Sequence, residues 1–543
     1  MLSTMGDVEL GISMIFEHGR TVNARSEVVT FDGTKVSRIT FAALSQRVGQ
    51  LANALRALGI TGDERVGTLM FNRQEHQEAY FAIPCMGAVM HTLNFRLHPD
   101  QFTYVVNHAD DRVIIFEGFL APLLLAVRDR LPNVRTLIMV GDAPEGVAVP
   151  DEVLRYEDVL AAQSPEFDWP IIAERNAAAI CYTSGTTGDP KGVVYSHRSM
   201  FLHALGFLAN FEVSQDDRIL AIVPMFHVNA WGLPYAAWFC GADLLMPSRF
   251  LQAEPLCRFL ALESPTMSAG VPTVWSDVLR WSETHDVDFS RLKRIIVGGS
   301  AVPVSLIDNF QKRHNITIIQ AWGMTETSPL GAVANAPRGT PVEAQLAYRA
   351  KTGRPMAGIS LRIVDEDGNV LPNDGVAVGE LEAIGPWVTS SYFQDRAPEK
   401  FQIDDRGRVW LRTGDVASID AEWYVQITDR AKDVIKSGGE WISSVDLENA
   451  LMGHPAVAEA AVVAVPDARW DERPMACIVI REGASVTPAD LATFLDGKVA
   501  KWWIPERWTF IAEVPKTSTL KFDKKVLRAR YAAGDLTVTS LTA

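Results

Sequence analysis

Helix-type and strand-type segments alternate along the first two thirds of the chain, and this pattern strongly constrains the fold. Residues Phe41–Ile60 carry apolar side chains at helical spacing, and Arg65–Phe71 is a short apolar run typical of a buried strand. Tyr80–Met90 again has helical character, and Val113–Phe116 has strand character. Further strand-type runs are Ala178–Thr183, Ile219–Val223, Ala242–Met246, Arg294–Val297 and Ile316–Gln320. The alternation predicts βαβ units on mostly parallel sheets, an α/β fold.

The pattern changes near Gly358. Short apolar runs separated by turn residues, such as Ser360–Val364 and Val378–Ile384, predict a small antiparallel β unit. A charged connector, Asp429–Asp433, comes next. After it, helix-type and strand-type runs form a compact group at Ser444–Met452, Val457–Val465, Met475–Ile480 and Pro488–Leu495. We therefore place the main domain boundary near Lys432.

Composition excludes several classes of protein. A length of 543 residues predicts at least two domains, and a net charge of −15 disfavours non-specific nucleic-acid binding. The five cysteines are scattered and form no CxxC pair, so we expect no disulfide framework and a reducing compartment. No signal-peptide pattern is present, and no uncharged apolar run reaches the roughly 18–20 residues of a bilayer span. We expect a cytoplasmic protein, with peripheral membrane contact left open.

The segment Tyr182–Gly192 follows an apolar strand and is rich in groups that bind phosphate. Its glycines, Gly185 and Gly188 among them, let backbone N–H groups approach an anion. The side-chain donors are Thr183, Ser184, Thr186, Thr187 and Lys191. A kinase-type P-loop requires lysine between glycine and a hydroxyl residue, and here Pro190 precedes and Gly192 follows the lysine. A glycine- and threonine-rich surface turn is the structural alternative.

This loop resembles the signature loop of the adenylate-forming enzymes, which include acyl-CoA synthetases, luciferases and the adenylation domains of peptide synthetases. Other segments resemble motifs of that superfamily in the same order: Pro224–His227, Gly298–Ala301, Gln320–Glu326, Trp410–Asp415, Asp429–Arg430 with Lys436–Glu440, and Pro515–Arg528. The resemblance implies that ATP activates a carboxylic acid as its adenylate and that coenzyme A then takes the acyl group, releasing AMP and pyrophosphate.

The same resemblance implies a domain organisation. Residues 1–431 would form a large AMP-binding domain of two αβαβα-type sheets plus a small β-barrel unit. Residues 432–543 would form a small, mobile α+β domain that rotates about Lys432 between the two half-reactions. The implied cofactor is Mg²⁺, with ATP and CoA as cosubstrates.

Roles in nucleotide binding follow from the matched motifs. Thr183 and Glu326 would lie close to Mg²⁺, which prefers hard oxygen ligands. Asp415 would accept from the ribose hydroxyls, and Arg430 would add a cation near ribose and phosphate. Trp322, where the superfamily usually has tyrosine, would stack on adenine, with ordinary core packing as the alternative. The remaining implied positions are Gly299, Ser300, Ala301, Gln320, Ala321, Gly323, Met324 and Thr325.

Lys521 is implied as the catalytic residue of the first step. An ammonium group between the carboxylate and the α-phosphate would lower their mutual repulsion. Leu520 stands where the superfamily usually has glycine, and a solvated basic surface with Lys516, Lys524 and Lys525 is the alternative. In the second step, the CoA thiol would pass Lys436, Ser437, Gly438, Gly439, Glu440 and Trp441. A simple hairpin turn is the alternative for that segment.

The segment Phe226–Trp231 indicates which acid is used, because it resembles the segment of bacterial fatty acyl-CoA synthetases in which a tryptophan gates an acyl tunnel. Trp231 and Val271 would line that tunnel, and His227 would lie near the carboxylate, with a structural role as its alternative. We expect a medium- or long-chain fatty acid. The alternatives are an aryl, short-chain or methylthio-alkanoic acid, or an inactive lipid- or nucleotide-binding homologue. The segment before Phe41 resembles one through which related synthetases form homodimers.

Overall fold

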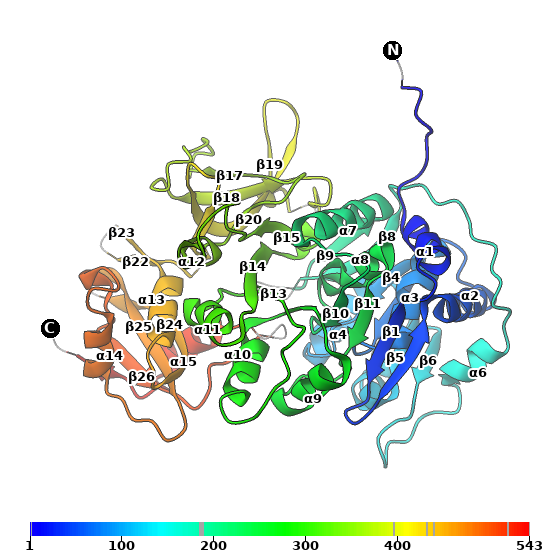
Figure 1. Ribbon diagram of the computed structural model, residues 1–543, viewed down its shortest axis with the longest axis horizontal. Helices are drawn as coiled ribbons and strands as arrows, with labels where there is room; N and C mark the ends of the chain where they lie inside the picture. Colours follow the sequence, from blue (N-terminus) through cyan, green and yellow to red (C-terminus); the bar gives the residue numbers. More distant parts are fainter. Residues whose placement is uncertain are drawn as a thin grey trace.

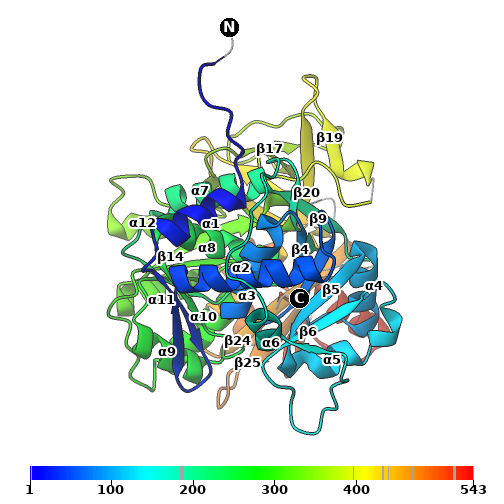
Figure 2. The ribbon, with the colours of Figure 1, turned by 90° about the vertical axis from the view of Figure 1, so that its right-hand side faces the viewer.

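The computed structural model describes residues 1, 3–183, 189–394, 397–430, 433–437, 440–467, 469–517 and 521–541, and within these ranges the strands form four β-sheets. Two large sheets with their helices form the body of the molecule, and a third sheet lies above them in Figure 1. The C-terminal residues form a separate lobe to one side. The N-terminal residues extend away from the body in both views (Figures 1 and 2).

A seven-stranded sheet comes from the first part of the chain, in the order β7-β6-β5-β3-β4-β8-β9. Neighbouring strands are parallel except for the β8–β9 pair. The strands are β3 (Arg65–Leu69), β4 (Val89–Thr92), β5 (Asp111–Glu117), β6 (Thr136–Val140), β7 (Leu154–Arg155), β8 (Ala177–Tyr182) and β9 (Gly192–Ser196). The associated helices are α2 (Phe41–Ala57), α3 (Gln74–Cys85), α4 (Pro99–Ala109), α5 (Ala121–Leu125) and α6 (Tyr156–Ala161). In α2, the apolar side chains spaced at three and four residues are buried, as their periodicity predicts.

The nine-stranded sheet has the order β16-β15-β14-β13-β12-β10-β11-β1-β2 and is parallel from β14 to β1. Its strands are β1 (Glu27–Phe31), β2 (Val36–Thr40), β10 (Arg218–Ala221), β11 (Asp243–Met246), β12 (Met267–Gly270), β13 (Arg294–Gly298), β14 (Thr317–Gly323), β15 (Leu330–Val333) and β16 (Arg354–Pro355). The helices of this part are α1 (Ile12–Thr21), α7 (His197–Phe211), α8 (Leu233–Cys240), α9 (Ala253–Glu263), α10 (Pro272–Trp281), α11 (Val304–His314) and α12 (Val342–Arg349). Parallel strands end at the same edge, where open α/β sheets bind ligands.

The last two sheets are smaller. The region predicted as a β-barrel unit is an antiparallel sheet of β17 (Ser360–Val364), β18 (Gly379–Ile384), β19 (Phe401–Ile403), β20 (Val409–Ile419) and β21 (Val425–Arg430). The C-terminal sheet contains β22 (Ile435–Ser437), β23 (Glu440–Ile442), β24 (Val457–Asp467), β25 (Asp471–Ile480), β26 (Arg507–Phe510) and β27 (Thr539–Ser540). It packs with α13 (Ser444–Met452), α14 (Pro488–Leu495) and α15 (Lys524–Ala533) around two hydrophobic clusters of its own. The predicted α/β class with a smaller C-terminal domain is confirmed.

One predicted helix is wrong in its bounds. We expected a helix over Tyr80–Met90, but α3 covers Gln74–Cys85 and Met90 lies in β4. Gly87, at φ +96°, turns the chain between the two elements. Both elements are buried on all sides, so the apolar run has no periodicity that separates helix from strand. Among the described residues, no helix is long and apolar enough to cross a bilayer.

Candidate active site

Three side chains from distant segments meet at the turn Gly298–Gly299, at the carboxyl end of β13. A β-carbon placed on Gly298 would lie 3.2 Å from Cη2 of Trp231. One placed on Gly299 would lie 3.6 Å from Cγ1 of Val271 and 3.8 Å from Cε of Lys521. Gly299 has φ +88°, a conformation that favours glycine. The C-terminal domain therefore brings Lys521 against the turn where the predicted gate and tunnel residues lie.

His227 is partly buried beside two cationic side chains. Burial, together with the nearby charges of Lys521 and Arg96, lowers its pKa to about 3, so the imidazole is neutral at physiological pH. The Arg96 guanidinium lies over the Phe226 ring, 5.7 Å from its centroid, and burial lowers the pKa of Arg96. Among the described residues, no carboxylate pairs with Arg96. Two cations around a neutral imidazole suit an anionic ligand. Sequence reasoning missed Arg96, because it lies in none of the recognised motifs.

Asp415 connects two residues predicted to bind the nucleotide. The indole N–H of Trp322 donates to its Oδ2 at 2.8 Å, and Nε of Arg430 lies 2.7 Å from its Oδ1. Asp415 itself is only 2% exposed, and the Trp322 ring is also buried. Both carboxylate oxygens are thus fixed in direction, and each keeps a lone pair that can accept from a ribose hydroxyl.

Glu326 is a buried carboxylate, 6% exposed, in the short 3-10 turn Thr325–Thr327 that follows β14. Its Oε1 accepts a hydrogen bond of 2.7 Å from the Tyr392 hydroxyl, and Lys191 Nζ lies 5.0 Å from the centroid of the Tyr392 ring. No lysine or arginine of the described residues forms an ion pair with Glu326. The backbone carbonyl of Thr325 accepts from the Tyr195 hydroxyl at 2.8 Å. Tyr392 and Tyr195 lie outside the predicted motifs, so motif matching could not identify them.

The two ends of the candidate phosphate loop are joined to each other. Thr183 N donates to the Lys191 carbonyl at 2.9 Å, and Lys191 N donates to Thr183 Oγ1 at 3.0 Å. These bonds continue the β8–β9 pairing and close the loop at its base. Ser184, Gly185, Thr186, Thr187 and Gly188 lie outside the described residues, so their predicted contacts remain predictions.

Other predicted nucleotide positions have structural partners of their own. The Gln320 side chain accepts from Val302 N at 3.1 Å and donates to the Lys351 carbonyl at 2.8 Å, so it holds the chain after β13. Ala321 and Gly323 lie in β14, and a β-carbon on Gly323 would lie 1.7 Å from the Pro329 carbonyl oxygen. Ser300 and Ala301 are exposed at the turn, and Met324 and Thr325 follow β14.

Trp231 is held by an unusual backbone segment. Val228, Asn229, Ala230 and Trp231 have φ values of 38°, 37°, 53° and 55°, so four consecutive residues are left-handed. Asn229 Oδ1 accepts from Thr92 Oγ1 at 3.1 Å and from Cys181 Sγ at 2.9 Å, which ties the segment to β4 and β8. The Trp231 ring is 4% exposed and lies against Gly298.

The predicted CoA-binding residues lie in the C-terminal lobe. Lys436 is exposed, and the Ser437 hydroxyl is buried and accepts from Arg473 at 3.3 Å. The β22–β23 hairpin lies at the edge of this lobe in Figure 1. Gly438, Gly439 and the predicted hinge Lys432 lie outside the described residues, as do the side chains of Glu440 and Trp441.

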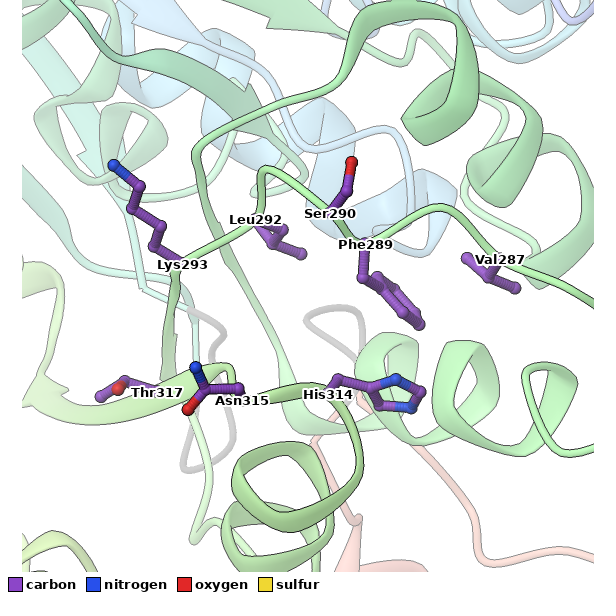
Figure 3. Close-up of a pocket in the computed structure, with 8 residues that line it drawn as sticks. All are labelled: Val287, Phe289, Ser290, Leu292, Lys293, His314, Asn315 and Thr317. Atoms are coloured by element: carbon purple, nitrogen blue, oxygen red, sulfur yellow. The ribbon is translucent and has the colours of Figure 1, made fainter. Parts of the chain in front are cut away.

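A surface hollow of about 510 Å³ lies at the edge of the nine-stranded sheet opposite the candidate site. Figure 3 shows side chains such as Phe289, Lys293 and His314 around it. It adjoins the amino ends of β13 and β14, whereas the candidate site lies at their carboxyl ends. The hollow is therefore separate from the site.

Comparison with known proteins agrees with this geometry. A sequence model of the AMP-binding enzyme family matches residues 16–393, and one of the AMP-binding enzyme C-terminal domain matches residues 446–521. A Thermus thermophilus protein named long-chain-fatty-acid–CoA ligase is 44% identical, over 97% of this chain and 97% of that protein. A 3-methylmercaptopropionyl-CoA ligase of Ruegeria lacuscaerulensis is 41% identical, over 98% of this chain and 99% of that protein. The crystal structure of an anthranilate CoA ligase with anthranoyl-AMP matches with a TM-score of 0.88 at 26% identity, over 98% of this chain and 100% of that one.

A fold of two large α/β sheets with a small C-terminal domain, and a site at the strand ends, define an adenylate-forming enzyme. The chain belongs to the AMP-binding enzyme family, as its motifs predict. It has the chemistry of an AMP-forming acyl-CoA ligase, with ATP, a carboxylic acid and CoA as substrates and an acyl adenylate as intermediate.

Proposed function

We propose that the acid is a medium- or long-chain fatty acid. The observation that carries this proposal is the buried Trp231 ring at the Gly298 turn, with Val271 beside the next residue, because an apolar wall there favours an alkyl chain. Each methylene buried in such a tunnel would add about 0.8 kcal/mol of binding. The relative named as a long-chain ligase supports the same class. The relative named for 3-methylmercaptopropionate makes a short thioether acid the second candidate.

In the first step, Lys521 would stand between the carboxylate and the α-phosphate. Its Cε lies near Gly299, and its charge acts on His227, so the ammonium is on the side of the site where the acid would enter. Neutral His227 would orient the carboxylate by a hydrogen bond. Asp415, with Arg430 beside it, would accept from the ribose hydroxyls. Thr183 and Lys191 would contribute phosphate donors from the base of the loop.

The residues predicted to hold Mg²⁺ fit that ion. Glu326 is a buried carboxylate with a hydroxyl partner and no cationic partner among the described residues, and such a charge needs compensation. Thr183 supplies a hydroxyl oxygen, and both are the hard ligands that magnesium prefers. When bound, the ion would neutralise phosphate charge. We expect Glu326→Gln, which keeps an acceptor for Tyr392, to raise the Mg²⁺ concentration needed for half-maximal ATP–pyrophosphate exchange.

The test of the acid class is ATP–pyrophosphate exchange across saturated fatty acids from acetate to palmitate, with benzoate and 3-methylthiopropionate. We expect the highest kcat/KM with a medium- or long-chain acid. Trp231→Ala should move the preferred chain length with little change in the KM for ATP. The control is Trp423→Ala, at an exposed tryptophan in the β20–β21 turn. Highest activity on benzoate or 3-methylthiopropionate, or an unchanged acyl profile in Trp231→Ala, contradicts the proposal.

The role of Lys521 has a separate test. Lys521→Ala should abolish adenylate formation while thioester formation from supplied acyl-AMP continues. Equal loss of both half-reactions would show that Lys521 does not act specifically in adenylation. For the second step, we propose that the domain after Lys432 rotates and brings the β22–β23 hairpin to the CoA thiol.

We further propose a cytoplasmic homodimer, with peripheral membrane contact as a property to be tested. All five cysteines are free thiols, which suits a reducing compartment. The N-terminal residues extend from the body and carry exposed Met1, Met5 and Val8, apolar groups that a second copy could cover (Figure 2). Light scattering should give the dimer mass, and removal of the first eight residues should shift the protein toward monomer.

A further inference from the structure

We propose that Lys524 is a positioning residue that fixes the loop carrying Lys521 against the large domain for the adenylation step. The inference rests on the proposed role of Lys521. It adds a residue that touches no substrate and acts through the loop that it anchors.

The loop before α15 is closed on itself. Thr517 N donates to the Lys521 carbonyl at 2.7 Å, and Lys521 N donates to Thr517 Oγ1 at 3.2 Å. Asp523 N donates to the Pro515 carbonyl at 2.7 Å, and the Asp523 side chain caps α15 by accepting from Val526 N. Lys521 therefore lies in a hairpin joined directly to the first turn of α15, where Lys524 is the first helical residue. A shift of Lys524 will move Lys521 as well.

Lys524 is inserted into a buried polar cluster. Its Nζ lies 2.8 Å from Oε1 of Glu448 and donates to the Ser444 hydroxyl, both on α13. Ser444 in turn donates from its backbone N to Oδ2 of Asp429 at 3.0 Å and from its hydroxyl to the same oxygen. The side chains of Lys524 and Glu448 are 10% and 9% exposed.

This cluster spans the predicted hinge. Asp429 lies in β21, in the antiparallel sheet of the large domain, whereas Ser444, Glu448 and Lys524 follow the hinge. A second bond joins the same elements, since the Ser443 hydroxyl donates to the Thr428 carbonyl at 2.7 Å. Two contacts therefore occur together in this orientation of the C-terminal domain. Lys521 reaches Gly299, and Lys524 is linked through Ser444 to β21.

The charge of Lys524 is needed for this link. Burial opposes an ammonium group, yet the carboxylates of Glu448 and Asp429 keep the pKa of Lys524 above its ordinary value. Removing the cation would leave Glu448 buried without its partner, which disfavours this packing of α15 on α13. The loop would then hold Lys521 less accurately, and a misplacement of about 1 Å can lower a rate about 100-fold.

The test compares Lys524→Met with Lys525→Met, the exposed neighbour on the same helix, and with Lys524→Arg. Lys524→Met should lower the kcat of ATP–pyrophosphate exchange by about 100-fold, with little change in the KM for ATP. Thioester formation from supplied acyl-AMP should fall far less. Lys525→Met should match the wild type in both assays, and Lys524→Arg should recover most of the exchange rate. Unchanged exchange, or equal loss in both half-reactions, overturns the proposal.

Two further measurements keep the test decisive. If Lys524→Met does not fold, Ser444→Ala removes the bridging hydroxyl with a smaller change, and selective loss of exchange is again expected. Acetylation of Lys521 by acetic anhydride, followed by mass spectrometry, reports its position without catalysis. Acyl-AMP should protect Lys521 in the wild type and in Lys525→Met, but not in Lys524→Met; equal protection in all three contradicts positioning by Lys524. If Lys521→Ala keeps the full rate of ATP–pyrophosphate exchange, the proposed catalytic role of Lys521 is wrong. The acetylation pattern still shows whether Lys524 positions Lys521.

Discussion

Asp415 shows how a single substitution in a motif is accommodated. Trp322 stands at a tyrosine position of the superfamily, and its indole N–H takes one oxygen of Asp415 while Arg430 takes the other. A tryptophan N–H is a donor only, so Trp322 can bond to this carboxylate but its side chain cannot accept a bond from a ribose hydroxyl. The substitution keeps a flat ring at this position and adds a fixed donor to the carboxylate that would bind ribose.

Trp322→Phe isolates that donor. The flat ring stays, but a buried hydrogen bond to a charged group is lost, at a cost of about 1.5–3 kcal/mol. We expect the KM for ATP to rise by about tenfold or more in exchange assays, with a smaller effect on the KM for the acid. Trp508→Phe is the control, because its buried indole N–H has no partner among the described residues. An unchanged KM for ATP in Trp322→Phe would show that the donor does not support nucleotide binding.

The segment Val228–Trp231 is an element whose backbone costs free energy. Left-handed conformation costs L-residues roughly 1–2 kcal/mol each, and four occur in succession here. Such a segment persists because its surroundings hold it, through the bonds of Asn229 to Thr92 and Cys181 and the packing of Trp231 on Gly298. This strained backbone holds the predicted gate, Trp231, in a fixed position.

Two alanines with equal burial test this strain. Ala230 lies in the left-handed segment and Ala236 in helix α8, and both are fully buried. Each change to glycine removes one buried methyl group, but glycine relieves strain at Ala230 and weakens the helix at Ala236. The free energy of unfolding of Ala230→Gly should exceed that of Ala236→Gly by about 2 kcal/mol. Equal values from urea titrations would contradict the strain.

Buried neutral histidines couple the stability of the whole molecule to pH. Burial lowers the pKa of His76, His203 and His227 to about 3 and that of His197 to about 4. The unfolded chain binds these protons below about pH 6.5, whereas the folded protein does not. Each imidazole therefore contributes stability that is fully present above the unfolded pKa and is lost as pH falls from about 6.5 toward 3.

His203→Phe removes one of these contributions. The His203 ring packs edge to face on Trp387, its Nε2 has no partner among the described residues, and phenylalanine has a similar shape. As the pH falls below about 6, the free energy of unfolding of the wild type should decrease by about 1.4 kcal/mol per pH unit relative to that of the variant. Parallel urea titrations at a series of pH values measure the difference, in which the other titrating groups cancel. A constant difference between pH 6 and pH 4 would contradict a neutral His203.

Local patterns in the chain predicted many elements well. The residues Ser360–Val364, Ser444–Met452 and Pro488–Leu495 form the elements expected of them, with the same bounds. Turn residues and caps delimit these elements, and both act within a few positions of the chain. The bounds around Met90 failed because the neighbouring segments are buried on every side and lose their periodicity.

Periodicity and ordered motifs are properties of the chain alone, so they were enough to predict the α/β class, the two-part organisation and the family. Which residues meet across the fold depends on tertiary packing: Lys521 with Gly299, Tyr392 with Glu326, and Lys524 with the cluster that includes Asp429. Arg96, Tyr195 and Tyr392 lie outside the motifs and join the site through packing between distant segments. Contacts of this kind depend on how whole elements pack, and that packing sums many weak interactions that no short stretch of sequence contains.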